Sequence, residues 1–408
     1  MGRAGAGTLT SGVGRGSVHR RVDLPTAGAR VGAGGQTRSG GHEAGLPAGW
    51  DALAGPDDLF LTRRWLRVVE EGLTAPLRYL WLDRAGQVVA AVPAVLATVD
   101  VPWVLSRPDV ILHNSLAAGL PDAAGFLAGL PGAAGPPDPA DSGWSATGAL
   151  MPGLVAGGRH LGHTRMLSGP ATTAADLDRL LAALEQLATG WRAASVAFPY
   201  LDDRDDTLGG VLRGRGYRSF VSGRYSTLTV PADGFPGYLA ALPRKRRVSV
   251  AAERRRIRSA GVVLTTRPLA DVDLAVLARL EVALLRKHGI DWDPDRGAAI
   301  LAAVAESFGQ HAFVVQAYAD GGLRGFVLVL AHADQWYCRQ AGFDYPYQRR
   351  TRLPLYFELL FYHLVAEAAG AGVTTIHYGL GSTEAKRSRG CHVTDQRCWL
   401  RTLPGVPG

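Results

Sequence analysis

Apolar and polar residues follow two different spacings along the chain, and these spacings predict helices and strands. Apolar residues three or four positions apart predict amphipathic helices over 57–73, 176–191, 207–217, 272–289 and 353–372. Alternating or continuous apolar runs bounded by turn residues predict strands within 79–98, 194–200, 311–343, 373–380 and 395–403. The mixture of the two patterns predicts an α/β protein.

The order of these predicted elements repeats once. The strand pair within 79–98 matches the strand pair around the turn at 319–322. Both halves then continue in the same order, over 181–217 and 359–391. This order is a long helix that ends at glycine, a strand, a polar turn and a short segment ending near Gly. Because antiparallel strands precede a crossover helix each time, we expect two related units on a mixed sheet.

The length of 408 residues agrees with two or three units. Residues 1–47 are rich in Gly and hold half of the net charge of +8, so we expect a disordered tail, or residues that precede the true start of the protein. The segment Pro131–Gly143 reads as a surface loop. We therefore expect a first domain over 48–225 and a second over 226–408.

Several classes of protein are excluded by composition. The sequence has no run of eighteen apolar residues and its start lacks the apolar core of a signal peptide, which indicates a cytoplasmic protein. Three cysteines without a Cys-x-x-Cys spacing predict neither a disulfide framework nor a zinc knuckle. Cys391, His392 and Cys398 have no evident fourth ligand, so we expect no metal.

Charge is concentrated in one segment of the second half. Leu242–Gly261 contains eight basic residues and a single acid, Glu253, with sparse apolar positions. This pattern predicts a helix with a basic exposed face, which is either simply solvated or contacts phosphate. Aromatic residues do not interleave with the arginines, which argues against a single-strand nucleic-acid reader.

The chain has three lysines against forty-one arginines, so each lysine is informative. Lys386 lies in GLGSTEAKRSRGC, directly after a predicted strand. Lysine is a compact charge whose pKa is easily shifted, unlike the permanent planar charge of arginine. Lys386 is therefore either a site residue or the solvated end of a helix.

Taken together, the second half resembles the GNAT acyltransferase superfamily, and within it the tandem-domain branch of Fem-like and BioF2-like proteins. The resemblance covers about Leu239 to Gly390 and rests on order and spacing: the basic segment, the run Arg339, Ala341, Gly342 and Asp344, then Tyr356, then Gly379, Lys386 and Gly390. It implies two tandem GNAT-like domains, the first degenerate and the second carrying the active site.

The resemblance implies roles for particular residues. Lys386 is expected to bind phosphate and to stabilise developing charge. Apart from the resemblance, an attacking amine must lose a proton, and Glu384 and His288 are base candidates, although each also fits an ordinary surface or helix-end residue. Donor or substrate binding is expected from Arg246, Arg247, Arg254, Arg339, Asp344, Arg349, Arg350, Arg352, Tyr356 and Arg389.

One stretch departs from the superfamily pattern. The loop that cradles a CoA pyrophosphate normally contains glycine, whereas Gln348–Leu353 reads QRRTRL. Thr351, as a helix cap, and the neighbouring arginines would have to replace the backbone cradle. The donor co-substrate could therefore be an acyl-CoA, an acyl carrier protein or an aminoacyl-tRNA. We expect no permanently bound cofactor.

The predicted reaction is transfer of an acyl or aminoacyl group to an amine of a small molecule or peptide. Aminoacyl-tRNA as donor would account for the basic helix. Two alternatives stay open: a non-catalytic protein that binds nucleic acid or another anion through its arginines, and a Fem-like scaffold without activity.

Overall fold

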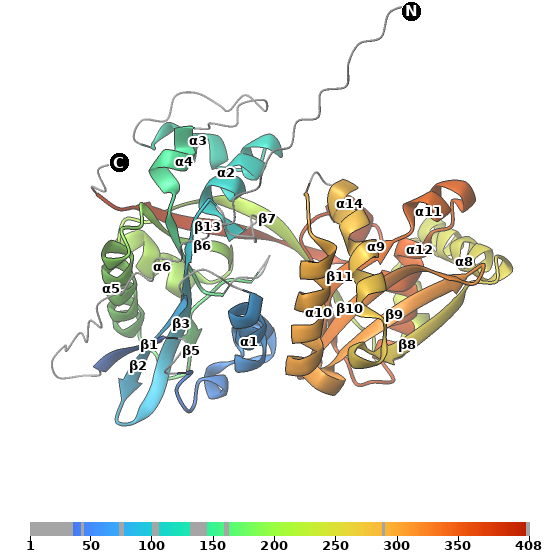
Figure 1. Ribbon diagram of the computed structural model, residues 1–408, viewed down its shortest axis with the longest axis horizontal. Helices are drawn as coiled ribbons and strands as arrows, with labels where there is room; N and C mark the ends of the chain where they lie inside the picture. The colour runs from blue at the N-terminus through green and yellow to red at the C-terminus, as the bar shows by residue number, and fades with distance from the viewer. Residues whose placement is uncertain are drawn as a thin grey trace, which may run out of the picture.

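The computed structural model describes residues 36–41, 45–72, 77–99, 106–130, 145–158, 163–287 and 290–404. In these residues the strands form one mixed sheet, in the order β1-β2-β3-β4-β6-β13-β7-β12-β11-β10-β9-β8, and the short β5 (Leu167–Ser168) pairs with β3. Two lobes share this sheet (Figure 1). The strands are β1 (Gln36–Gly41), β2 (Leu77–Arg84), β3 (Gln87–Ala97), β4 (Gly153–Ala156), β6 (Ser195–Asp202), β7 (Arg218–Thr229), β8 (Val263–Pro268), β9 (Ala312–Ala319), β10 (Gly322–His332), β11 (Gln335–Phe343), β12 (Thr375–Gly379) and β13 (His392–Thr402).

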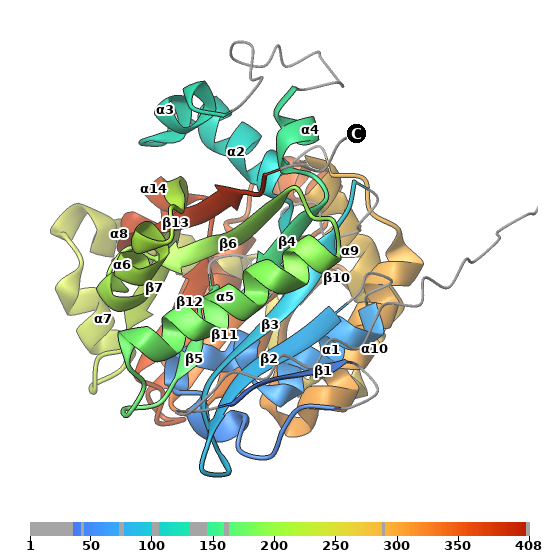
Figure 2. The ribbon, with the colours of Figure 1, turned by 90° about the vertical axis from the view of Figure 1, so that its left-hand side faces the viewer.

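The predicted repeat is present in the strand pairing. In the first half β2, β3 and β4 are antiparallel neighbours, and β6 returns parallel to β4 after α5 (Ala174–Gly190). In the second half β9, β10 and β11 are antiparallel neighbours, and β12 returns parallel to β11 after a long helix. Figure 2 shows α5 lying across the strands of the first half. The predictions of a mixed sheet and of two related units are confirmed.

The last strand of the chain lies inside the first half of the sheet. β13 is antiparallel to β6 on one side and to β7 on the other, and β7 in turn pairs with β12. The domain boundary expected at 225/226 falls within β7, so backbone hydrogen bonds continue across it. The two halves are therefore joined by the sheet itself, and not by a linker.

Helices cover both faces of the second-half sheet. One face packs against α9 (Leu274–Lys287), α10 (Pro294–Phe308) and α1 (Arg63–Gly72), whose apolar residues share one core. The other face packs against α7 (Phe235–Ala241), α8 (Arg244–Ser259) and a long helix made of α12 (Leu355–Phe357), the π-helical turn η6 (Glu358–His363) and α13 (Leu364–Ala368). α1 comes from the first half, so it also ties the two halves together.

Several elements differ from the sequence predictions. The helix predicted over 57–73 is divided into the 3-10 helix η2 (Pro56–Leu61) and α1. Within the predicted tail, Gln36–Gly41 form β1 along β2, while 1–35 and 42–44, like the predicted loop Pro131–Gly143, lie outside the described residues. The remaining helices are η1 (Asp51–Leu53), α2 (Pro108–Ala117), α3 (Ala123–Ala128), α4 (Ser145–Leu150), α6 (Asp206–Gly214), η4 (Leu269–Asp271), η5 (Gly309–His311), α11 (Tyr345–Thr351) and α14 (Thr383–Arg387).

In the part of the chain that the structure describes, no helix is both long and apolar enough to cross a membrane.

Because β13 lies in the middle of the sheet, we expect a substitution in its buried face to destabilise the fold. Trp399 on β13 is 6% exposed and packs in the core of the first half. We expect Trp399→Ala to lower the free energy of unfolding by about 3 to 5 kcal/mol because it leaves a cavity in that core. Urea unfolding followed by far-UV circular dichroism measures this loss, and the exposed His392→Ala on the same strand is the control. Two separate transitions, with the second half unaffected, would contradict the joined sheet.

Candidate functional site

Two parallel strands separate in the middle of the second-half sheet. β11 and β12 pair over three residues only, ending where Tyr337 lies opposite His377. Beyond this point β11 follows β10 to Phe343, and β12 follows β7 to Gly379. Backbone groups at such a place, beyond the carboxyl ends of parallel strands, are available to a ligand. We call this place the strand parting.

The equivalent place in the first half is filled by the chain itself. β4 and β6 pair only as far as Val155 and Ala197. Beyond it the Thr164 N–H donates to the Tyr200 carbonyl at 3.1 Å, and the Arg165 N–H donates to the Gly157 carbonyl at 3.2 Å. The Tyr200 N–H in turn donates to Thr164 Oγ1 at 2.7 Å. Segment 164–165 thus takes the hydrogen bonds that a ligand would need.

Lys386 holds the end of β12 at the strand parting. Its buried ammonium donates to the carbonyl oxygens of Tyr378 at 2.7 Å, Gly379 at 3.0 Å and Leu380 at 2.7 Å. Burial lowers the pKa of Lys386 to about 8. These three bonds match the three N–H donors of a lysine. Lys386 therefore organises the turn after β12, and contact with a substrate phosphate stays a prediction.

Tyr356 lies at the same end of β12. Its half-buried ring packs against Phe343 and Phe357. Ser382, in the turn that Lys386 holds, is near enough to its hydroxyl to oppose part of the rise in its pKa. Burial raises the pKa of Tyr356 to about 12. The phenol therefore keeps its proton at neutral pH and is a hydrogen-bond donor beside the strand parting.

The α9 side of the strand parting carries a group of polar residues that the sequence analysis partly missed. A β-bulge at Arg339 interrupts the pairing of β11 with β10. The Arg339 guanidinium lies 5.2 Å from the ring of Trp65, and Gln340 Nε2 donates to Glu281 Oε1 at 2.7 Å. Burial raises the pKa of Glu281 and lowers that of Arg339. Glu281 was detectable as an acid on the apolar face of the helix predicted over 272–289.

A buried cluster of rings lies at the base of the strand parting. The Tyr337 and His377 rings stack at 4.1 Å, and His377 lies 2.6 Å from Gln335 Oε1 and 3.2 Å from the Tyr225 hydroxyl. The His163 ring is 5.6 Å from that of His377. Burial lowers the pKa of His163 to about 4 and that of His377 well below its usual value, so both rings are neutral at pH 7.

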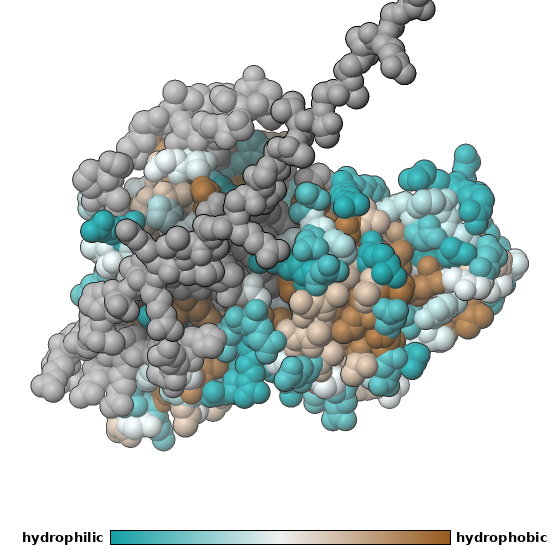
Figure 3. All heavy atoms as spheres, viewed as in Figure 1, coloured by the Kyte–Doolittle hydropathy of each residue, from teal (hydrophilic) through white to brown (hydrophobic). Residues whose placement is uncertain are grey.

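The predicted binding arginines fall into two groups. Two are engaged inside the protein: Arg254 pairs with Glu358 at 3.2 Å, and the buried Arg389 pairs with Glu253 at 3.1 Å. Others are exposed on α8 and around α11, and Figure 3 shows hydrophilic residues gathered over α11. We call this second group, with the exposed basic neighbours on α8, the basic surface: Arg244, Lys245, Arg247, Arg255, Arg256, Arg258, Arg349, Arg350 and Arg352.

The remaining predicted site residues have the following places. Arg246 is half-buried on α8, and Asp344 caps α11 and pairs with Arg324 at 2.9 Å. The exposed Glu384 pairs with Arg387 at 2.5 Å, and His288 lies outside the described residues. Thr351 was expected as a helix cap, but that prediction was wrong: Pro354 is the N-cap residue of α12.

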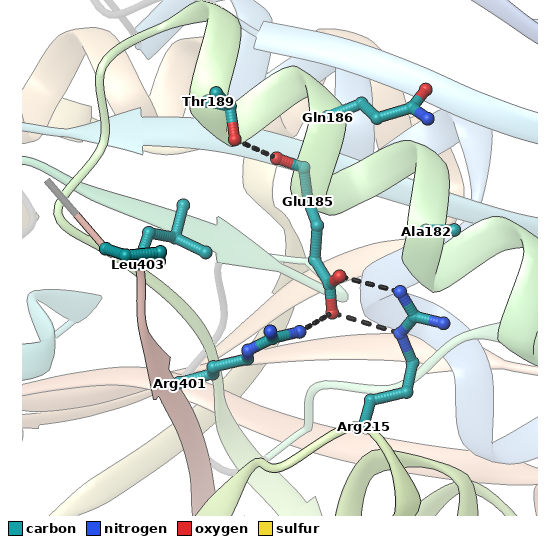
Figure 4. A pocket seen from close by; sticks show the side chains of 8 residues that line it. Ala182, Glu185, Gln186, Thr189, Arg215, Arg401 and Leu403 are labelled. Atoms are coloured by element: carbon teal, nitrogen blue, oxygen red, sulfur yellow. Dashed lines mark hydrogen bonds and ion pairs between the residues drawn. The ribbon is translucent and has the colours of Figure 1, made fainter.

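A separate hollow on the first half does not add to the site. It lies between α5 and the end of β13, where Arg215 and Arg401 both pair with Glu185, at 2.7 Å and 2.9 Å (Figure 4). The two cations are thus already engaged. Among the described residues, no group of His, Cys, Asp and Glu side chains is arranged to hold a metal ion.

The hydrogen bonds of Lys386 predict that its replacement lowers the stability of the fold. We expect Lys386→Met to lower the free energy of unfolding by roughly 3 kcal/mol or more, because buried carbonyls lose a charged donor. Urea unfolding measures it, with the exposed Arg387→Met as the matched control. A Lys386→Met variant as stable as the control would show that the ammonium does not hold the turn.

The two buried histidines predict a dependence of stability on pH. An unfolded His163 binds a proton below about 6.5, but the folded one does so only near pH 4, so the unfolded state binds more protons in between. Stability should therefore rise from pH 4 to 6.5 and be fully present above 6.5.

Urea unfolding between pH 4 and 7.5 tests this dependence, and His163→Phe should show a flatter curve than the wild type. The exposed His392→Ala is the control. Equal pH dependence in wild type and His163→Phe would mean that this ring is not held neutral.

Comparison with known proteins agrees with this geometry. The sequence profile of the family described as "Acetyltransferase (GNAT) domain" matches residues 244–387, which include α8 and the strand parting. No curated protein sequence matches the chain.

Solved structures are similar to the chain in fold. FemX superposes with a TM-score of 0.56 at 10% identity, over 87% of this chain and 95% of that one. A tandem GNAT protein from the clavulanic acid biosynthesis pathway has a TM-score of 0.45 at 14% identity, over 88% and 93% of the two chains. A GCN5-related N-acetyltransferase from Sphaerobacter thermophilus has a TM-score of 0.39 at 12% identity, over 81% and 82%. Residues 244–387 thus match the GNAT acetyltransferase domain family, and the chain has a fold similar to that of FemX.

Proposed function

We propose that the chain is an N-acyltransferase that moves an acyl or aminoacyl group from an activated donor to an amine. The single observation that carries the proposal is the strand parting, which lies within the matched GNAT domain and whose counterpart in the first half is filled by segment 164–165. Such a reaction requires a donor carbonyl held beside an amine, together with groups that accept charge and protons.

The basic surface supports a donor with several phosphates. α8 and the end of α11 are in contact, because Arg256 Nη2 donates to the Arg352 carbonyl at 2.7 Å. Their charges therefore form one continuous surface, beside the long helix that carries Tyr356. A surface of this extent suits the backbone of an aminoacyl-tRNA, whereas a CoA thioester needs only one phosphate pocket.

The connection between α11 and α12 favours the same donor. Arg352 has a positive φ of 54°, and Leu353 and Pro354 follow it before the helix begins. This segment has no glycine, so the close backbone approach that cradles a pyrophosphate is not provided. The exposed Arg349, Arg350 and Arg352 would contact phosphate through their side chains.

The acceptor is proposed to be an amine of a small molecule or peptide, as in the formation of a secondary metabolite or the modification of a cell-wall precursor. Lys386 would act mainly by holding the turn that places Ser382 near Tyr356. The Tyr356 hydroxyl would donate to oxygen atoms of the bound donor.

Salt dependence tests the donor. We expect binding of a fluorescently labelled aminoacyl-tRNA to weaken steeply between 50 and 200 mM salt, by roughly 10³-fold or more if six or more phosphates are contacted. Arg255→Ala with Arg258→Ala should lower the slope by about 2. Fluorescence anisotropy measures both, and Arg67→Ala with Arg192→Ala, exposed arginines elsewhere, is the matched control.

Transfer itself is tested with each donor separately. Acetyl-CoA and aminoacylated tRNA are incubated with glycinamide and an alkylamine, and amide products are measured by mass spectrometry. Formation of an amide from either donor supports the proposed function. Salt-sensitive tRNA binding without any transfer would favour a non-catalytic nucleic-acid-binding protein.

A further inference from the structure

One buried carboxylate on the α9 side of the strand parting has no structural explanation. Glu281 is 8% exposed, and its Oε1 accepts from Gln340 at 2.7 Å. Its Oε2 is buried and has no hydrogen-bond partner among the described residues. A buried charged oxygen without a partner destabilises a fold. The fold by itself therefore gains nothing from this oxygen.

The sequence around Glu281 brings its helix unusually close to β11. A Cβ atom on Gly342 would lie 2.5 Å from the carbonyl carbon of Leu280 and 2.6 Å from the nitrogen of Glu281. Only glycine allows this approach of helix backbone to strand backbone. Gly342 thus positions the backbone of Glu281 directly against the strand that borders the strand parting.

The β-bulge in β11 brings two further side chains to Glu281. Cys338 pairs with Val329 and Gln340 with Leu328, so Arg339 is the extra residue of β11. The bulge turns Arg339 and Gln340, which are consecutive, toward the same helical layer, because one lies over Trp65 and the other bonds Glu281. Bulges of this kind redirect side chains next to active sites. Here they surround one carboxylate with a cation and an amide.

We propose that Glu281 accepts the proton of the attacking amine through Oε2, a role that rests on the proposed function. The unpartnered oxygen is the acceptor, Gln340 fixes the orientation of the carboxylate, and the nearby Arg339 charge favours the ionised form against the opposing effect of burial. The amine then approaches the donor carbonyl from the α9 side, while Lys386 and Tyr356 organise the end of β12.

The proposed step balances as follows. The amine nitrogen forms a bond to the carbonyl carbon, the carbonyl electron pair moves to oxygen, and one N–H proton moves to Glu281 Oε2. Collapse of the tetrahedral intermediate re-forms the carbonyl and breaks the bond to the leaving sulfur of a thioester or oxygen of an ester. The leaving group takes a proton from Glu281, which returns the carboxylate to its starting form.

The decisive experiment compares two acceptors in the wild type and in Glu281→Gln. After attack, the nitrogen of an alkylamine adduct is weakly acidic and needs a proton acceptor, whereas the adduct of the weakly basic methoxyamine gives up its proton readily to water. We expect Glu281→Gln to lower kcat/KM for the alkylamine by about 10²-fold to 10⁴-fold and that for methoxyamine much less. The rate of the variant with the alkylamine should rise with pH beyond the range in which the wild type is constant.

A measurement without substrate accompanies it. Because burial raises the pKa of Glu281, the folded protein binds more protons just above pH 4.5, and the ionised carboxylate costs stability at higher pH. Glu281→Gln should therefore raise the urea midpoint at pH 7. Asp176→Asn is the control, since it removes a buried carboxylate that pairs with Arg84 and Arg179 and should lower the midpoint.

Each outcome decides the proposal. A selective loss with the alkylamine, together with a raised urea midpoint, supports Glu281 as the proton acceptor. An equal loss with both amines, or a lowered midpoint in Glu281→Gln, overturns that role and leaves the acyltransferase intact. A wild-type chain that transfers nothing from either donor to either amine overturns the proposed function, and the role of Glu281 with it.

Discussion

The structure depends on the antiparallel insertion of β13 between β6 and β7. This strand is the last in the chain, yet it lies in the middle of the sheet, and β7 beside it continues the pairing into β12. The turn that Lys386 holds leads through α14 into β13, so the end of β12 is followed closely by the inserted strand. Beyond the strand parting, β12 is consequently paired with β7, while β11 is paired with β10.

The strand parting is organised differently on its two sides. On the side of the long helix, the buried ammonium of Lys386 donates hydrogen bonds to backbone carbonyl oxygens. Lys386 therefore supports the turn that contains Ser382. On the α9 side, Glu281 lies buried with one oxygen unpartnered among the described residues. A buried charge whose hydrogen bonds are made supports the structure, whereas a buried polar atom without a partner calls for another explanation. This difference separates the supporting group from the proposed reacting group.

Arginine content alone is a poor guide to binding. Glu253 and Glu358 engage Arg389 and Arg254 inside the protein, whereas the outer arginines of α8 and α11 are exposed to solvent. Because ion pairs formed in buried places are not available to a ligand, the basic surface is smaller than the basic segment in the sequence. Its continuity across two elements is nevertheless what a nucleic-acid backbone requires.

The sequence by itself determined the local elements and their repetition. The spacing of apolar residues predicted α5, α6, α9, β9 to β13 and the long helix. Each of these elements buries one face, and the resulting apolar period can be read from neighbouring residues alone. The rarity of lysine directed attention to Lys386, and order and spacing indicated the tandem GNAT fold. Only the tertiary structure placed β13 between β6 and β7, paired Arg254 and Arg389 with acids, and brought Gly342 against Glu281. These features depend on contacts between residues far apart in the chain, which no local pattern encodes.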